Sequence, residues 1–213
     1  MIQNVSLAFV RLAFALLGFV GLIAQYLYNV ANIVHYQPVN FFSFFTVQSN
    51  IIAVGTLAVA AACTWRGQRP RWLDYVRGAA TIYMVITGIT YSLLLRNVAV
   101  DTAVPWVNLV LHYVLPIVMI VDWMIDLPQV RISVRSAMIW LVYPVLYLAY
   151  SLIRGPIVDW YPYPFLDPRP SGYGAVVVVS LAIALGGLLF AVLASWTTSF
   201  QLRVHKQDAQ VRA

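Results

Sequence analysis

The chain has 213 residues, of which 62% are hydrophobic and only 9% are charged. In soluble domains about a quarter of the residues carry a charge, so this composition excludes an ordinary soluble protein and indicates an integral membrane protein. We attribute the net charge of +6 to membrane topology and anionic lipid headgroups. Nucleic-acid binding would require a folded basic surface with stacking side chains, which the sequence does not provide.

Apolar runs recur six times along the chain, and each is long enough to cross about 30 Å of hydrocarbon. The predicted spans are 6–30, 41–65, 73–95, 106–125, 134–153 and 173–197. Their connections are short. We therefore expect an all-α fold in which residues 1–213 form a single polytopic bundle of six transmembrane helices, with no soluble domain.

Arginine and lysine are distributed unevenly between the two sides of this predicted bundle. Only Arg96, Arg154 and Arg169 fall on one side. The other ten fall on the opposite side: Arg11, Arg66, Arg69, Arg71, Arg77, Arg131, Arg135, Arg203, Lys206 and Arg212. Because basic residues are enriched in cytoplasmic loops, the sequence predicts that both termini are cytoplasmic.

The N-terminal segment is predicted to be a membrane helix rather than a cleaved signal peptide. It lacks a basic region before the apolar run and a clear small-x-small cleavage site. The chain has one lysine and no glutamate, which is typical of a GC-rich bacterial genome. We expect a multi-pass protein of a bacterial plasma (inner) membrane whose partner is the lipid bilayer, and the oligomeric state stays open.

Polar side chains inside the predicted spans gather in the outer half of the membrane. Five spans contribute them: Gln25 and Asn29; Thr46, Gln48, Ser49 and Asn50; Thr87, Thr90, Tyr91 and Arg96; Asn108 and His112; Tyr147, Tyr150, Ser151 and Arg154. Residues four apart share a helix face, so pairs such as Thr46 and Asn50 predict one common cavity. The alternative is interhelical hydrogen bonding without a ligand, worth about 0.6 kcal/mol per bond. The sixth span has almost no polar residues, so it is expected to form an apolar wall of the bundle and to contribute no polar group to the cavity.

His112 is the only histidine within a predicted span. An ionisable group in the bilayer costs about 2.5 kcal/mol or more, so it usually faces the bundle interior and marks a functional site. Pro116 cannot donate to the carbonyl of His112, so the fourth span is predicted to kink beside the histidine.

The residue inventory excludes several enzyme classes. One intramembrane histidine is too few for a bis-histidine haem, a histidine-rich di-iron centre or a zinc site. The absence of glutamate excludes a glutamate-dependent intramembrane metalloprotease, and no Gly-x-Ser-x-Gly elbow occurs. We therefore expect no cofactor and no metal. Asp122, near the cytoplasmic end of the fourth span, is expected to be solvated or paired with Arg131 or Arg135.

Three segments occur in order along the chain: Phe44-Phe45-Thr46-Val47-Gln48-Ser49-Asn50, Asn108-x3-His112-x3-Pro116 and Trp160-Tyr161-Pro162-Tyr163-Pro164-Phe165-Leu166-Asp167. Together they resemble the androgen-induced-gene family of six-pass membrane proteins, most closely its prokaryotic relatives. The resemblance covers most of the chain. In eukaryotic members it implies hydrolysis of fatty acid esters of hydroxy fatty acids, with Thr46 as the nucleophile and His112 beside it. The spacing of Pro116 and the Ser49-Asn50 pair depart from the eukaryotic pattern, so the substrate stays open.

The implied chemistry is also reasonable for these residue types. A threonine hydroxyl needs a base to act as a nucleophile, and His112 is the only side chain at matching depth that titrates near neutral pH. Asn50 and Asn108 are expected to orient the imidazole ring or to donate to an oxyanion.

Further side chains are expected to contact the substrate. Tyr91, Tyr147 and Tyr150 face the expected cavity, and Arg154 can pair with a carboxylate, unless it only extends to the headgroups. Trp160 lies in an aromatic segment that either covers the cavity or forms an interfacial belt.

Three functional hypotheses follow. The first is an intramembrane threonine hydrolase of lipid esters that uses Thr46 and His112. The second is a non-catalytic lipid or small-molecule binder or transporter that uses the same cavity. The third is a scaffold, for which Gly186 and Gly187 offer a contact face.

Overall fold

The computed structural model describes residues 2–98 and 104–211, with side chains described for 5–98 and 104–198. Arg203, Lys206 and Arg212, which entered the predictions above, lie outside the described side chains. Within the described part, six helices are long and apolar enough to cross a membrane: Val5–Asn32, Phe45–Trp65, Arg71–Leu95, Pro105–Ile125, Val134–Val158 and Pro168–Thr198. The predicted all-α, six-span membrane fold is confirmed.

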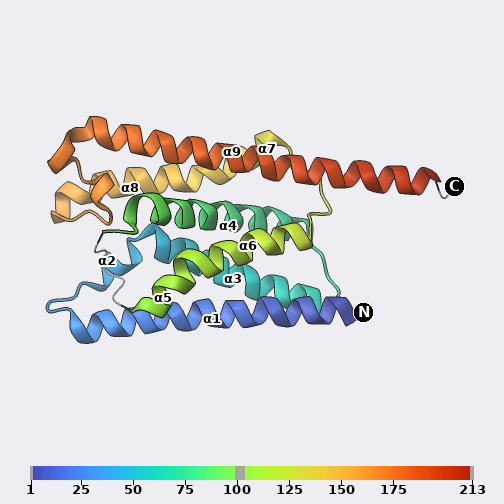
Figure 1. The fold of residues 1–213 in the computed structure, drawn as a ribbon, viewed down its shortest axis with the longest axis horizontal. Coiled ribbons are helices and arrows are strands. Elements are labelled where there is room, and N and C mark those ends of the chain that lie inside the picture. The colour runs from blue at the N-terminus through green and yellow to red at the C-terminus, as the bar shows by residue number, and fades with distance from the viewer. Residues whose placement is uncertain (1, 99–103, 212–213) are drawn as a thin grey trace.

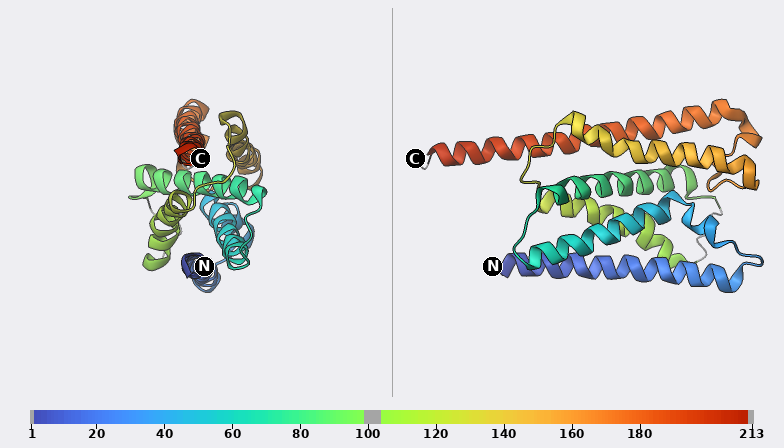
Figure 2. Two further views of the ribbon diagram at one scale, coloured as in Figure 1. Left: turned by 90° about the vertical axis from the view of Figure 1, so that its right-hand side faces the viewer. Right: turned by 180° about the vertical axis from the view of Figure 1, so that it is seen from behind.

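Successive spans run in opposite directions between the two ends of the molecule (Figure 1). The two termini lie at the same end, called here the terminal end, and the short helix α2 (Pro38–Phe42) lies at the opposite end. Helices α1 (Ile2–Asn32), α3 (Phe45–Trp65), α4 (Arg71–Thr90) and α6 (Leu115–Ile125) pack against one another. Helices α8 (Val142–Val158) and α9 (Pro168–Val211) lie together beside α4 (Figure 2).

Helix α1 buries one face against its neighbours and exposes the others. Most of its buried residues recur at alternating steps of three and four: Ala8, Arg11, Ala15, Gly18, Leu22, Gln25 and Asn29, with Gly21 buried beside Leu22. This spacing makes one narrow stripe on an α-helix, and the stripe packs mainly against α3. Large apolar residues such as Phe9, Leu16 and Phe19 are exposed on the other faces, where a bilayer would cover them.

The second span begins four residues later than predicted. Residues 41–44 belong to α2 and a break at Ser43 and Phe44, and α3 starts at Phe45. Thr46 therefore lies in the first turn of α3, and not five residues after the start of the span as the predicted bounds have it. Hydropathy alone cannot separate two consecutive apolar helices, but Pro38 favours a helix start at its position and thus a separate α2.

Two spans contain π-helical turns. Helix α4 continues into η1 (Tyr91–Leu95), and the fourth span consists of α5 (Pro105–Leu109), η2 (Val110–Val114) and α6. Irregular backbone beside His112 was predicted from Pro116, and the structure forms it as a π turn directly before Leu115 and Pro116. Such turns are rare and frequent at functional sites.

Each of the last two spans has a departure from regular α-helix near its start. The fifth consists of α7 (Val134–Met138), η3 (Ile139–Leu141) and α8, which extends five residues past the predicted end at 153. In α9 the backbone breaks at Gly172, with a φ of 74° that glycine adopts at little cost. The continuous helix then follows from 173, where the sixth span was predicted to start.

Candidate functional site

The first turn of α3 is capped by two tyrosine hydroxyls from outside the helix. The Phe45 backbone N–H donates to the Tyr147 hydroxyl at 3.2 Å, and the Thr46 N–H donates to the Tyr163 hydroxyl at 3.0 Å. The first N–H groups of a helix have no partner within it, and Phe44 at the N-cap offers no side-chain acceptor. The two tyrosines therefore satisfy this buried helix start.

Tyr163 also contacts the Thr46 side chain. The Thr46 Oγ1 and the Tyr163 hydroxyl oxygen are 3.1 Å apart, and both residues are buried. Burial raises the pKa of the Tyr163 phenol to about 12, so the hydroxyl keeps its proton at neutral pH. Sequence reasoning did not single out Tyr163. The signal that could have found it is the aromatic run 160–167, which was interpreted as a cavity cover or an interfacial belt.

The loop that carries Tyr163 is held at the end of α8. Asp159, with a φ of 52°, ends the helix in the left-handed conformation, and the Trp160 N–H donates to the Gly155 carbonyl at 3.2 Å. A Cβ at position 155 would overlap the ring of Tyr161. Gly155 therefore allows the loop to fold closely over α8, which brings Tyr163 to the start of α3.

The imidazole of His112 is held from two sides. Its Nδ1 lies 3.1 Å from the carbonyl oxygen of Asn108, and Tyr91 stacks on the ring with centroids 4.0 Å apart and an interplanar angle of 26°. A carbonyl only accepts hydrogen bonds, so Nδ1 carries the proton and the neutral ring keeps its lone pair on Nε2. Asn108 Nδ2 in turn donates to the Tyr91 hydroxyl at 2.5 Å.

Asn50 links the backbone at Thr46 to the backbone beside His112. Its Nδ2 donates to the Thr46 carbonyl at 2.8 Å and to the Leu111 carbonyl at 3.2 Å. Both amide protons are thus in use, so neither is free to donate to an oxyanion, and they contact backbone carbonyls and not the imidazole ring.

Thr46 and His112 border one small buried cavity of about 40 Å³. Its polar lining consists of Gln25, Asn29, Thr46, His112 and Tyr163, and apolar side chains complete it. A water molecule needs about 10–15 Å³, so this cavity has room for a water beside its five polar residues, although most of its lining is apolar. Among the described side chains, the Thr46 hydroxyl is hydrogen-bonded to Tyr163 rather than to His112.

A larger apolar cavity of about 110 Å³ adjoins the polar one, and Thr46, Leu95 and Tyr163 border both. Tyr147 and Tyr91 line the apolar cavity, as predicted for substrate-contacting residues. The Thr46 hydroxyl and the Tyr163 phenol thus lie between two adjoining cavities, and His112 borders only the smaller one.

The other predicted contact residues form a layer outside both cavities. The Tyr150 hydroxyl lies 2.8 Å from the Ser43 hydroxyl, and Arg154 donates to Asn40 Oδ1 at 2.7 Å. The Arg154 guanidinium lies over the ring of Trp160 at 5.3 Å, and Trp160 contacts Phe44, which borders the polar cavity. Tyr150, Arg154 and Trp160 line neither of the two cavities.

Some polar residues expected at the cavity instead join helices. Ser49 bonds to Thr87 at 2.8 Å across α3 and α4, and Gln48 accepts from the Tyr143 hydroxyl at 2.5 Å. These contacts match the alternative of interhelical hydrogen bonding.

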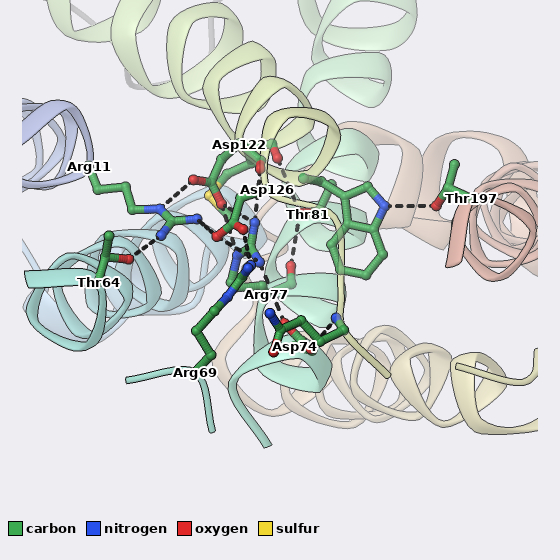
Figure 3. Close-up of polar contacts among 12 residues, drawn as sticks. Arg11, Thr64, Arg69, Asp74, Arg77, Thr81, Asp122, Asp126 and Thr197 are labelled. Carbon is green, nitrogen blue, oxygen red and sulfur yellow. Dashed lines mark hydrogen bonds and ion pairs between the residues drawn. The ribbon is translucent and has the colours of Figure 1, made fainter. Parts of the chain in front are cut away.

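A second polar cluster lies at the terminal end and was not predicted (Figure 3). The carboxylate of Asp122 on α6 receives Arg11 Nε from α1 at 2.6 Å and Arg77 Nη2 from α4 at 2.8 Å. All three residues are buried. The expected pairing of Asp122 with Arg131 or Arg135 is therefore wrong, because helix packing places α1 and α4 beside the carboxylate.

Further residues complete this ion-pair cluster. Arg11 also contacts Asp126 at 2.7 Å and Thr64 Oγ1 at 2.6 Å, and Arg69 pairs with Asp126. Asp74 accepts from the backbone of Gln129 at 3.0 Å and lies 3.6 Å from Arg77. The cluster joins four of the spans at one end of the bundle, opposite the two cavities.

None of the protein-family models, curated proteins or solved structures compared with this chain matches it. The likeness to the androgen-induced-gene family thus rests on the three sequence segments alone.

Proposed function

We propose that the protein is an intramembrane threonine hydrolase of lipid esters, with Thr46 as the nucleophile and His112 as the general base. The observation that carries this proposal is that both residues border one buried polar cavity while the base is held in a defined tautomer. A base works when its lone pair can reach the proton of the nucleophile directly or through one water, and the cavity that both residues border has room for one water.

In the first step, His112 Nε2 takes the Thr46 hydroxyl proton as Oγ1 attacks the ester carbonyl carbon. The bond from that carbon to the alkoxy oxygen breaks, and His112 returns the proton to the departing alcohol. Water then attacks the acyl-threonine with His112 again accepting a proton. The carboxylic acid leaves and Thr46 regains its hydroxyl.

Charge that develops on the carbonyl oxygen needs a donor placed in advance. The Tyr163 hydroxyl, protonated at neutral pH, is the donor nearest to Thr46 Oγ1. The start of α3 adds the positive end of the helix dipole at the same place. Asn50, Asn108 and Tyr91 act as positioning residues for the nucleophile and the base.

We further propose that the terminal end faces the cytoplasm of a bacterial plasma membrane. Arg11 and Arg77 are neutralised by aspartates, but Arg66, Arg71, Arg131 and Arg135 remain exposed at that end. Basic residues near span ends favour the cytoplasmic side. The smaller cavity then lies in the outer half of the bilayer, and the larger one extends from there to the middle of the fifth and sixth spans.

The test is hydrolysis of a fluorogenic long-chain acyl ester by purified protein, with labelling by a lipid fluorophosphonate. We expect Thr46→Ala and His112→Gln each to lower kcat/KM by about a hundredfold or more and to abolish labelling, whereas Thr46→Ser retains both. Thr56→Ala is the matched control, since Thr56 lies on α3 and its hydroxyl donates to the carbonyl of Ile52 in the same helix. Hydrolysis unchanged in Thr46→Ala contradicts the proposal.

A non-catalytic lipid binder is the second candidate. It is favoured by one observation, the hydrogen bond of Thr46 to Tyr163 instead of His112. Saturable lipid binding that survives Thr46→Ala, without ester turnover in the native protein, identifies this alternative. A carrier is disfavoured, because the ion-pair cluster occupies the bundle interior at the terminal end.

A further inference from the structure

The apolar cavity lies between α4 and the α8–α9 pair. Its wall is mostly aliphatic, with contributions such as Ile86, Leu141, Leu148 and Ile183, and no charged side chain borders it among the described residues. Several of its polar side chains already have partners within the protein: Thr87 bonds to Ser49, Tyr147 to Ser43 and Thr46 to Tyr163. Burying an uncompensated polar group costs free energy, so the cavity suits a hydrocarbon.

Two residues of the wall are exposed on the membrane-facing surface. Val145 on α8 is 58% exposed, and Ala184 on α9 is also exposed. Each lies near the middle of its span, Val134–Val158 for the first and Pro168–Thr198 for the second. The mouth of the cavity therefore faces the hydrocarbon core of the bilayer and not its aqueous border.

The helices on either side of this mouth are the least packed of the six spans. Only 22% and 17% of the residues in the apolar windows of the fifth and sixth spans are buried, against 56% for the second and third. Separating α8 from α9 therefore breaks fewer contacts than moving α1, α3, α4 or α6, which pack closely against one another. These two helices are the ones that an entering chain can separate most easily.

One side chain in the wall lacks a partner. The Ser180 hydroxyl on α9 is buried, lines the cavity and has no hydrogen bond among the described residues. Membrane serines commonly bond to a carbonyl of their own helix, and a buried polar atom without a partner calls for an explanation. A polar atom on a molecule within the cavity would supply one.

We propose that a single hydrocarbon chain enters this cavity sideways from the bilayer, between α8 and α9 at Val145 and Ala184. The chain runs along the apolar wall toward Thr46 and Tyr163, where its polar end reaches the polar cavity. The cleavage of that end rests on the proposed function, but the binding of the chain does not.

The test measures binding separately from turnover. Purified protein in lipid nanodiscs is irradiated with a fatty acid that carries a diazirine, and labelled peptides of α8 and α9 are quantified. Val145→Trp and Ala184→Trp fill the mouth and are expected to lower labelling about tenfold, equivalent to about 1.4 kcal/mol. Leu146→Trp and Leu185→Trp are matched controls, because these neighbours are 61% and 65% exposed but do not line the cavity.

Equal labelling in all four tryptophan variants overturns the entry site. Loss in the mouth variants alone, together with full labelling of Thr46→Ala, supports it even where the native protein hydrolyses no ester, so the two proposals fail separately.

A second measurement uses smaller substitutions, in case a tryptophan at these positions prevents folding. Cys63, the single cysteine, is replaced by serine, and a cysteine is placed at 184 or at 185. Excess oleate is expected to slow maleimide labelling of Ala184→Cys but not of Leu185→Cys. An effect of oleate that is equal at the two positions, or absent at both, contradicts the proposal.

Discussion

The Tyr91 ring stacks on the His112 imidazole at a centroid distance of 4.0 Å, and each ring belongs to a π turn, η1 for Tyr91 and η2 for His112. An extra residue in a helical turn shifts the side chains that follow to a new direction. The two π turns thus aim one ring from each helix at the same point, and Asn108 holds both rings through its amide and its carbonyl.

This arrangement predicts that Tyr91 acts through His112. Tyr91→Phe keeps the stacked ring and loses only the bond from Asn108, so we expect kcat for ester hydrolysis to fall by less than about tenfold. Tyr91→Leu removes the ring, and we expect a loss of about 10- to 100-fold, as for other partners that orient a functional imidazole. Steady-state kinetics on the acyl ester distinguish the two, and equal kcat in both variants rules out an orienting role.

Tyr163→Phe is expected to lower the free energy of unfolding by about 1–3 kcal/mol, because the Thr46 N–H loses its acceptor at a buried helix start. The measurement is thermal unfolding in detergent. Tyr143→Phe is the comparison, since it removes a phenol that bonds to Gln48 and not to the helix start. No loss of stability in Tyr163→Phe would mean that another group caps Thr46.

The buried phenol of Tyr163 leads us to expect that the free energy of unfolding decreases at alkaline pH. Burial raises the pKa of Tyr163 to about 12, whereas an unfolded tyrosine titrates near 10. Between these values the unfolded state loses its proton first, so stability is complete below about pH 10 and falls as pH rises toward 12. We expect the slope of unfolding free energy against pH to be smaller in Tyr163→Phe than in the native protein. Identical slopes contradict the assignment.

Gly155→Ala tests how the loop places Tyr163. A methyl group at 155 overlaps the Tyr161 ring, so the loop must shift and draw Tyr163 away from Thr46. We expect a loss of about 1–3 kcal/mol in stability together with reduced ester hydrolysis. Gly174→Ala is the control, because a methyl group there meets no atom within 4 Å. Should both variants behave alike, the close approach at Gly155 has no role in the site.

Removing a single charge from the ion-pair cluster is expected to lower the stability of the protein strongly. Arg11→Met leaves Asp122 and Asp126 with fewer cations in a buried setting, and breaking a buried pair from one side costs about 3–5 kcal/mol. Arg11→Lys should recover only part of this, since one ammonium cannot reproduce the forked contacts to two aspartates and Thr64. Arg66→Met, at an exposed position of the same end, is expected to change stability by less than about 0.5 kcal/mol. Equal melting temperatures for Arg11→Met and Arg66→Met would show that the cluster is not stabilising.

Much of the fold follows from the order of residues along the chain. Six apolar runs of membrane length predict six helices, since a spanning segment must satisfy its backbone internally. Pro116 predicts irregular backbone at His112, because a proline removes one hydrogen bond wherever it lies. The shared cavity of Thr46 and His112 was likewise expected, from their common depth and the lack of another intramembrane histidine.

Tertiary structure alone decided which side chains meet. Tyr163 reaches Thr46 across 117 positions of the chain, and Arg11 reaches Asp122 across 111. Such contacts depend on which helices become neighbours and on how a loop folds over a helix end. Local periodicity does not encode either property, because it records only which face of each helix is apolar. The sequence by itself therefore determined a six-helix membrane protein with one buried histidine near one threonine. Packing decided that a tyrosine caps the threonine and that two π turns orient the histidine.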